Sequence, residues 1–174
     1  EHGHRLPTWN GELYLEIHRG TYTTQSRNKR ANRKSEFLLH DAEFIAALAS
    51  TIDSSYIYPA AAFWKAWELI CLNQFHDIIP GSSINQVYID SQQDYMTIRD
   101  LAQTALQEAL QVITAHQPAG VTIINPTSFT RSDLALWQGH LEPGQQLRTE
   151  SGSSVQTQST SDGTWIALNT IAPY

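Results

Sequence analysis

The segment PAAAFWKAWELICLNQFHDIIPGSS, residues 59–83, largely decides the expected fold. From Phe63 to Phe75 its apolar residues recur at spacings of three and four, which is the period of an amphipathic helix. Proline at position 59 suits a first helical turn, and Pro80 with Gly81 requires the helix to end before them. We therefore predict a helix that begins near Pro59, with Cys71 on its apolar face as inert core.

Helical patterns also flank this segment. Upstream, the apolar positions favour a helix over residues 26–51, which the polar Asp53 and its serine neighbours end. Downstream, Ser82 or Ser83 is a plausible N-cap for a long helix that continues to Ile113. Three helices with short joints predict an antiparallel three-helix bundle.

The pattern changes after the breaker Gln-Pro-Ala-Gly at residues 117–120. Short β-type runs follow, separated by turn signals, at residues 121–124, 134–137, 155–160 and 165–168. The Ser/Thr/Gln-rich stretch 149–161 is typical of an exposed hairpin. The fold class is therefore mainly α with a β-rich C-terminal part, in which a three-helix bundle precedes the first strands of a β-sandwich.

This pattern predicts three regions. Residues 1–25 form an extended segment, in which Leu13–Thr24 is rich in aromatic and β-branched types and favours a strand. Residues 26–117 form the three-helix domain, and residues 118–174 begin the β-sandwich. The sequence starts at Glu1 rather than at methionine, so we expect a piece of a longer protein, which we call the parent.

Composition excludes several classes of protein. One cysteine in 174 residues permits no intrachain disulfide and fits a cytoplasmic protein, and no apolar run is long enough for a membrane span. Residues 1–34 carry seven Lys/Arg against three Asp/Glu, whereas the remainder carries four against fourteen. The basic cluster could bind nucleic acid, but the acidic remainder favours a solvated helix start and no nucleic-acid partner. The cluster comprises Arg27, Lys29, Arg30, Arg33 and Lys34.

Two segments could carry chemistry. In the first, His76 and Asp77 lie where the predicted second helix ends beside the Pro-Gly turn. Histidine can offer one ring nitrogen to a metal while a hydrogen bond holds the other. The residues alone favour a hydrogen-bonded structural histidine.

The second segment, residues 9–23, places Glu12, Glu16, His18 and Arg19 among aromatic residues. Carboxylates beside aromatic rings are typical of sugar sites, where a carboxylic acid protonates the glycosidic oxygen. On a strand, Glu12, Glu16 and His18 would share one face. Taken alone, the pattern favours a solvated strand face over a site.

Together these segments resemble family 38 α-mannosidases. GELYLE at residues 11–16 with HRGTYTTQ at 18–25 is similar to the passage from the catalytic region into the middle domain of that family. NQFHDIIPGSS at residues 73–83 resembles the metal-ligand segment of the branch shared by bacterial and vacuolar or cytosolic enzymes. IINPTSF at residues 123–129 resembles the entry to the C-terminal β-domain.

The resemblance implies that the parent is a metal-dependent retaining α-mannosidase that hydrolyses terminal α-mannosides, with one divalent ion, zinc in type. It makes His76 a metal ligand, gives Asp77 and Arg19 contacts with the sugar, and makes Glu12 the acid, with Glu16 as the alternative. The nucleophile and the other ligands belong to a barrel outside this chain, because the family's His-x-Asp-Pro-Gly-Trp motif is absent. A catalytic zinc takes three protein ligands, so we expect this chain alone to be inactive and without metal.

Two other functions stay open. The chain could be a non-catalytic helical protein-interaction module, with its aromatic residues serving as core or partner surface, or a nucleic-acid-binding module that uses the basic cluster. Burial of Trp64 and Trp67 would favour a plain bundle, whereas His76, Asp77 and Glu12 exposed on one rim would favour part of an active site. A homo-oligomeric parent is also left open.

Overall fold

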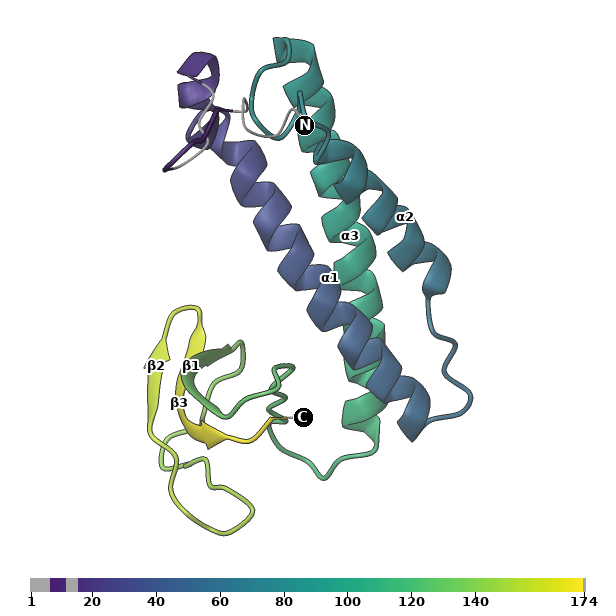
Figure 1. Cartoon of the computed structure of the whole chain (residues 1–174). Helices are drawn as coiled ribbons and strands as arrows, with labels where there is room; N and C mark the ends of the chain where they lie inside the picture. Colours follow the sequence, from purple (N-terminus) through teal and green to yellow (C-terminus); the bar gives the residue numbers. More distant parts are fainter. Residues whose placement is uncertain (1–6, 12–15, 174) are drawn as a thin grey trace. The chain divides into compact units, whose positions relative to one another are not determined.

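The computed structural model describes residues 7–11 and 16–173, without the side chains of residues 16 and 17 (Figure 1). Its elements form two compact units: one holds the described residues of Glu1–His40 and Pro59–Ala105, the other those of Asp41–Tyr58 and Leu106–Tyr174. In chain order, the elements are η2 (Glu16–Tyr22), α1 (Ser26–Ile52), α2 (Ala60–Asn73), α3 (Asn85–Ala115), β1 (Arg131–Trp137), β2 (Thr157–Thr160) and β3 (Gly163–Ile171).

The three predicted helices are confirmed, and each buries a stripe at helical spacing. In the first unit, Asn28 of α1 is bonded to Ser91 of α3, and Asn32 is bonded to Tyr95, so both helices advance in the same direction. Helix α2 runs back against them, as an up-down-up bundle requires (Figure 1). The buried apolar stripes are Leu39, Ala42, Ile45, Ala46 and Ala49 on α1; Phe63, Ala66 and Ile70 on α2; Tyr88, Tyr95, Ile98, Ala102, Ala105, Ala109 and Ile113 on α3.

The start of α3 differs from the prediction. The helix begins at Asn85, because the Ser83 hydroxyl donates a hydrogen bond to the Asp77 carbonyl (2.5 Å) instead of capping the helix. The Ser83 N–H is also taken, since it donates to the Tyr88 hydroxyl (2.9 Å). Residues 82 and 83 therefore belong to the preceding turn.

The predicted strand at Leu13–Thr24 is wrong for the residues that the structure describes there. Residues 16–22 form the 3₁₀ helix η2. The Gly20 carbonyl accepts the N–H groups of Thr23 (3.2 Å) and Thr24 (2.9 Å), and the Thr21 hydroxyl donates to the His18 carbonyl (2.8 Å). Local hydrogen bonds of this kind compete with strand pairing and outweigh the β-propensity of Thr and Tyr.

Cys71 is exposed, so its predicted place in the core is wrong. The core side of α2 is set by Phe63, Ala66 and Ile70. Cys71 follows Ile70 directly, and one residue turns a helix by about 100°. The cysteine therefore points away from the bundle.

In the second unit, three antiparallel strands form a sheet in the order β1-β3-β2. The predicted runs 134–137 and 165–168 are confirmed, since Leu136 pairs with Trp165 across β1 and β3. The run 155–160 is confirmed from Thr157, which pairs with Ile166 of β3. The run 121–124 forms no strand; it lines an apolar cavity of about 370 Å³ with β1 and β3.

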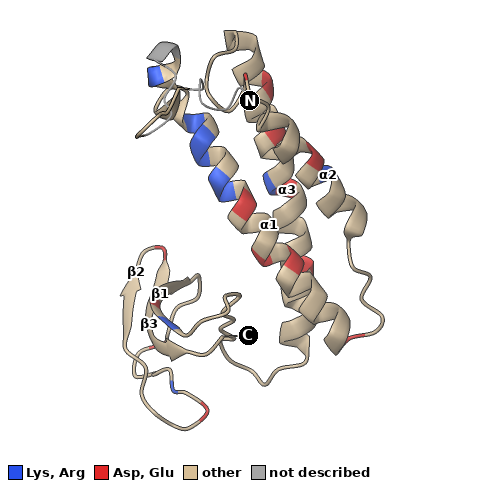
Figure 2. Cartoon of the chain, viewed as in Figure 1, with Lys and Arg blue, Asp and Glu red and all other residues tan. Residues whose placement is uncertain are grey.

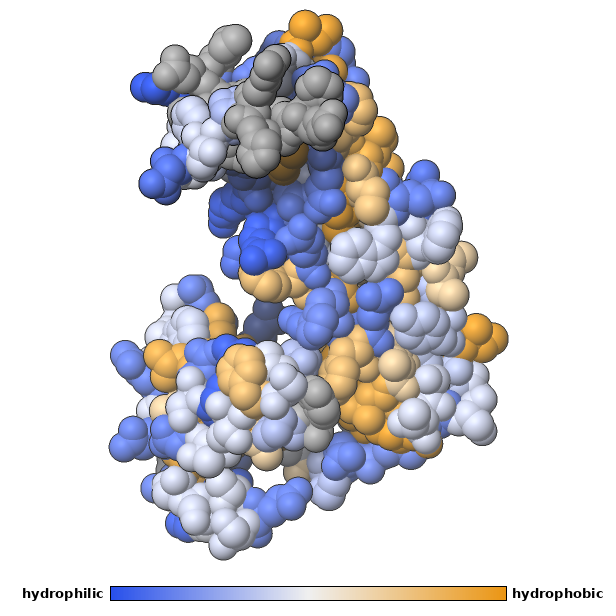
Figure 3. Space-filling view, viewed as in Figure 1, coloured by the Kyte–Doolittle hydropathy of each residue, from blue (hydrophilic) through white to orange (hydrophobic). Residues whose placement is uncertain are grey.

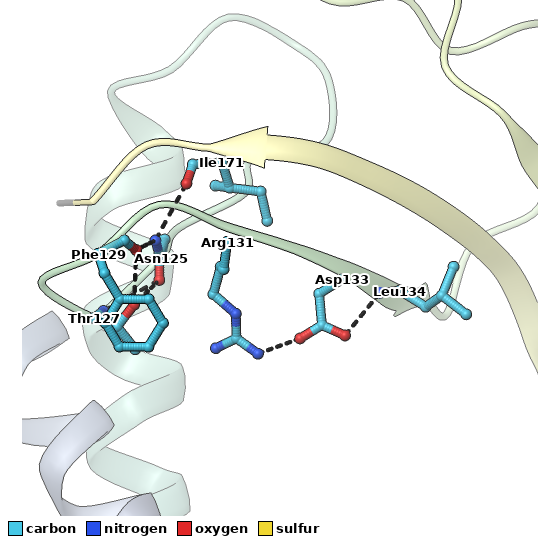
Figure 4. Close-up of polar contacts among 7 residues, drawn as sticks. All are labelled: Asn125, Thr127, Phe129, Arg131, Asp133, Leu134 and Ile171. Carbon is cyan, nitrogen blue, oxygen red and sulfur yellow. Dashed lines mark hydrogen bonds and ion pairs between the residues drawn. The ribbon is translucent and has the colours of Figure 1, made fainter.

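A buried amide, that of Asn125, joins the turn before β1 to the end of β3 (Figure 4). Its Nδ2 donates to the carbonyls of Phe129 (2.9 Å), Ala172 (3.1 Å) and Ile171 (3.4 Å). Its Oδ1 accepts from the N–H (3.2 Å) and the hydroxyl (2.6 Å) of Thr127. Asn125 is only 4% exposed, so its amide has little access to water as an alternative partner.

Asn125→Ala should destabilise the chain by about 1–2 kcal/mol, because it removes a buried amide that bonds to part-buried carbonyls and to a part-buried N–H. Urea denaturation measures this loss. The control is Asn169→Ala at an exposed position of β3, which should change stability by less than about 0.5 kcal/mol. Equal effects of the two substitutions would contradict the structural role of Asn125.

Candidate functional site

His76 and Asp77 lie side by side on the turn segment that joins α2 to α3. Their side chains are 76% and 58% exposed, and His76 Nε2 is 3.4 Å from Asp77 Oδ2. The Phe75 ring packs beside the imidazole, with 4.1 Å between ring centroids. His76 lies close to the end of α2, as predicted, and its ring is exposed. The segment thus presents an imidazole and a carboxylate together to solvent.

The turn itself is tight and depends on Gly81. The Ile78 N–H donates to the Phe75 carbonyl (2.8 Å), and the Gly81 N–H donates to the Ile78 carbonyl (3.1 Å). Gly81 has φ +91°, and a Cβ atom there would overlap the methyl group of Thr24. Only glycine tolerates both the backbone conformation and this close approach.

Helix α1 holds this turn through two adjacent residues. Lys29 Nζ donates to the carbonyls of Thr24 (2.7 Å) and Ile79 (2.8 Å), and Asn28 Nδ2 donates to the Ile78 carbonyl (3.3 Å). Burial lowers the pKa of Lys29. The interpretation of the basic cluster as a solvated helix start is therefore wrong for Lys29, which bridges two segments of backbone.

Helix α3 holds the turn from its other side. Ser83 and Tyr88 bond to each other, and the Ser83 hydroxyl reaches the Asp77 carbonyl. The Ser91 hydroxyl donates to Asn28 Oδ1 (2.6 Å). Asn28 thus connects α3 to the turn while its own backbone belongs to α1.

A second polar cluster fixes the last turn of α2. Gln74 Nε2 donates to Asn32 Oδ1 (3.1 Å) and to Glu36 Oε1 (2.8 Å). Asn73, which is 1% exposed, donates to Asp94 Oδ2 of α3 (3.0 Å). Burial, followed by the charges of Glu36 and Asp94, raises the pKa of the neighbouring Tyr95 well above its usual range. The tyrosine therefore stays protonated and can donate its hydrogen bond to Asn32 (3.3 Å).

These supporting residues were not predicted from the sequence, although the sequence contains a signal for them. Asn28, Asn32 and Ser35 continue, at spacings of four and three, the stripe that Leu39 and Ala42 place in the core. Polar residues on the buried stripe of a helix must find partners inside the protein. Polar periodicity on α1 therefore pointed to a buried network.

The other predicted site residues come from the segment that precedes α1. Arg19 lies on η2 with an exposed side chain, and Glu12 and the side chain of Glu16 fall outside the described residues. Within the described part of the chain, no three His, Cys, Asp or Glu side chains are grouped so that they could hold a metal.

The burial of the two tryptophans tests whether the chain is a plain bundle with both rings in its core. Trp64 is 71% exposed and bonded to Glu68 on the surface of α2, and Trp67 is half-buried. A plain bundle that uses both tryptophans as core is therefore not observed. His76 and Asp77 are exposed, but Glu12 is outside the described residues, so the condition stated for part of an active site stays a prediction.

The helical bundle thus carries a solvent-facing His-Asp pair on the turn that follows its second helix. Residues 16–113 match the family model described as alpha mannosidase middle domain, and the chain belongs to this family. It is 40% identical over 132 residues to mouse Alpha-mannosidase 2C1 and 54% identical over 87 residues to Alpha-mannosidase of Saccharomyces cerevisiae. These alignments cover 75% and 49% of this chain, but only 13% and 8% of the relatives.

Solved structures support the fold. A glycosyl hydrolase family 38 protein from Enterococcus faecalis superposes with a TM-score of 0.72 at 18% identity, over 98% of this chain and 26% of that one. An alpha-mannosidase from Enterococcus faecalis V583 gives 0.68 at 18% identity, over 89% and 23%. The predicted order of three helices and then an antiparallel sheet is thus confirmed. No helix in the described ranges has the length and apolar character to cross a bilayer.

Lys29→Met should destabilise the chain by about 1–3 kcal/mol, because the carbonyls of Thr24 and Ile79 lose their charged donor. It should also speed amide exchange at Gly81, whose hydrogen bond lies within the same turn. Thermal denaturation and hydrogen exchange measure the two effects. Lys65→Met, an exposed substitution on α2, is the control and should change neither. Unchanged exchange at Gly81 in Lys29→Met would contradict the role of Lys29.

Proposed function

We propose that the parent of this chain hydrolyses terminal α-mannosides with retention of configuration, and that His76 is one ligand of its divalent metal ion. The proposal rests mainly on the exposed imidazole of His76. This histidine lies on a turn that hydrogen bonds connect to α1 and α3. The relatives named α-mannosidases, of which this chain spans about an eighth or less, support the choice of substrate.

Only a few residues of the chain would take part in this reaction, each in a limited role. A ring nitrogen of His76 would bind the metal, and the Asp77 carboxylate 3.4 Å from Nε2 is placed to orient the ring or to accept a sugar hydroxyl. When bound, the ion would hold sugar hydroxyls and favour a distorted ring. Arg19 would contact the sugar, and Glu12, or else Glu16, would protonate the leaving oxygen. The nucleophile would come from polypeptide outside this chain.

The chain alone should neither hold the metal nor turn over substrate. Catalytic zinc sites use three protein ligands, and His76 supplies one. The retaining mechanism needs a second carboxylate about 5 Å from the acid, which the proposal assigns to the missing barrel. We also propose a cytoplasmic parent, with which the single cysteine of this chain is compatible, and a mannose-containing oligosaccharide as its partner.

In the parent, His76→Ala should lower zinc affinity and hydrolysis of a chromogenic α-mannoside together. The loss should exceed the roughly 10–100-fold that follows from changing a residue behind a metal ligand. Zinc titration and the rate assay measure the two quantities. His140→Ala, which removes an exposed histidine from the second unit, should leave both unchanged.

In the 174-residue chain, His76→Ala should change the free energy of unfolding by no more than about 0.5 kcal/mol, because the side chain is exposed. A large loss of stability here, with the zinc content of the parent intact, would show that His76 is structural. Measurable, zinc-independent turnover by the chain alone would contradict the division of the site between two parts of the parent.

A further inference from the structure

A groove of about 590 Å³ lies between α1 and α3 in the first unit. Four cationic side chains line it: Arg27, Arg30 and Lys34 from α1, and Arg99 from α3. Gln92 and Gln103 of α3 add exposed amide groups to its wall. Its volume lies in the range of pockets that bind small molecules.

The positive charge of this groove is not neutralised by its own described lining residues. None of its described lining residues is acidic, and Arg99 Nε lies 3.9 Å from the Asp100 carboxylate. The neighbouring stripe of α1 differs, because Lys29 is bonded to two carbonyls and Arg33 is paired with Glu36 at 2.9 Å. Figure 2 shows the cations on successive turns of α1, and Figure 3 shows strongly hydrophilic side chains over the same half of the helix.

The spacing of the cations limits what could neutralise them. From Arg27 to Lys34 the helix rises roughly 10 Å, so a single phosphate could not reach all three α1 cations. Like charges three and four residues apart on a helix destabilise it, and a bound anion relieves this repulsion. A ligand with at least two anionic groups therefore fits better than one.

We propose that this groove binds a small ligand that carries two or more phosphate or sulfate groups. The planar guanidinium groups of the three arginines would each bind an oxyanion through paired hydrogen bonds. A long nucleic acid fits less well, because the chain beyond residue 34 carries fourteen Asp/Glu against four Lys/Arg and would repel its flanks. The site is distinct from His76 and does not depend on the mannosidase proposal.

The test is calorimetric titration of the 174-residue chain with inorganic tripolyphosphate at about 50 mM and about 200 mM salt, over which phosphate contacts lose strength. Binding should weaken with salt, and Arg30→Gln should weaken it at least about tenfold. Arg33→Gln is the matched control, since its guanidinium belongs to the same helix but is paired with Glu36 outside the groove; its affinity should stay within about twofold. Circular dichroism checks that both variants keep their helices.

A second titration uses a disulfated disaccharide. Comparing the two probes distinguishes a free oligophosphate from a charged sugar as the source of the anionic groups. Tighter binding of tripolyphosphate supports a free oligophosphate, and tighter binding of the disaccharide supports a charged sugar. Three results would overturn the proposal: no binding of either probe at the lower salt, equal losses in Arg30→Gln and Arg33→Gln, or a DNA duplex that binds more tightly than both probes at the higher salt.

Discussion

The buried amide of Asn28 is the interaction on which the arrangement of the first unit depends. Its oxygen accepts the hydroxyl of Ser91 on α3 and its nitrogen donates to the carbonyl of Ile78, so one side chain of α1 fixes both a helix and a turn. A buried amide that lacks either partner carries a desolvation penalty, which ties the two contacts together. Lys29 adds a charged donor to the next carbonyl of the same turn. A surface histidine, His76, is thereby carried on a fixed backbone.

This arrangement divides the first half of α1 by function. One stripe, with Asn28 and Asn32, faces inward, where its polar groups bond to other parts of the protein, and Lys29 beside it bonds to the turn. The next stripe, with Arg30 and Lys34, lines the groove beside α3. A helix can serve both purposes because residues three and four apart share a face whereas adjacent residues do not. A charged run such as residues 27–34 therefore has to be interpreted one stripe at a time.

The periodicity of apolar residues predicted the helices correctly. The core residues of α2, such as Phe63 and Ile70, recur at the spacing of three and four that places them on one buried face of a helix. Periodicity failed at Cys71, which was predicted to lie in the core but is exposed beside it. It also failed near Gly20, where local hydrogen bonds form a turn instead of the predicted strand. The position of His76 near the end of α2 followed from Pro80 and Gly81, whereas the partners of Asn28 did not follow from the sequence. Its partners are sixty-three and fifty residues away, and no local pattern gives such pairings.

The measurement that tests the account most directly is a crystal structure of the parent protein with its divalent metal bound. The account predicts an imidazole nitrogen of His76 in the coordination sphere, with the remaining protein ligands supplied by residues outside this chain and the turn still bonded to Asn28 and Lys29. A metal site in which His76 is not a ligand, or a His76 ring buried and hydrogen-bonded away from the metal, would contradict it.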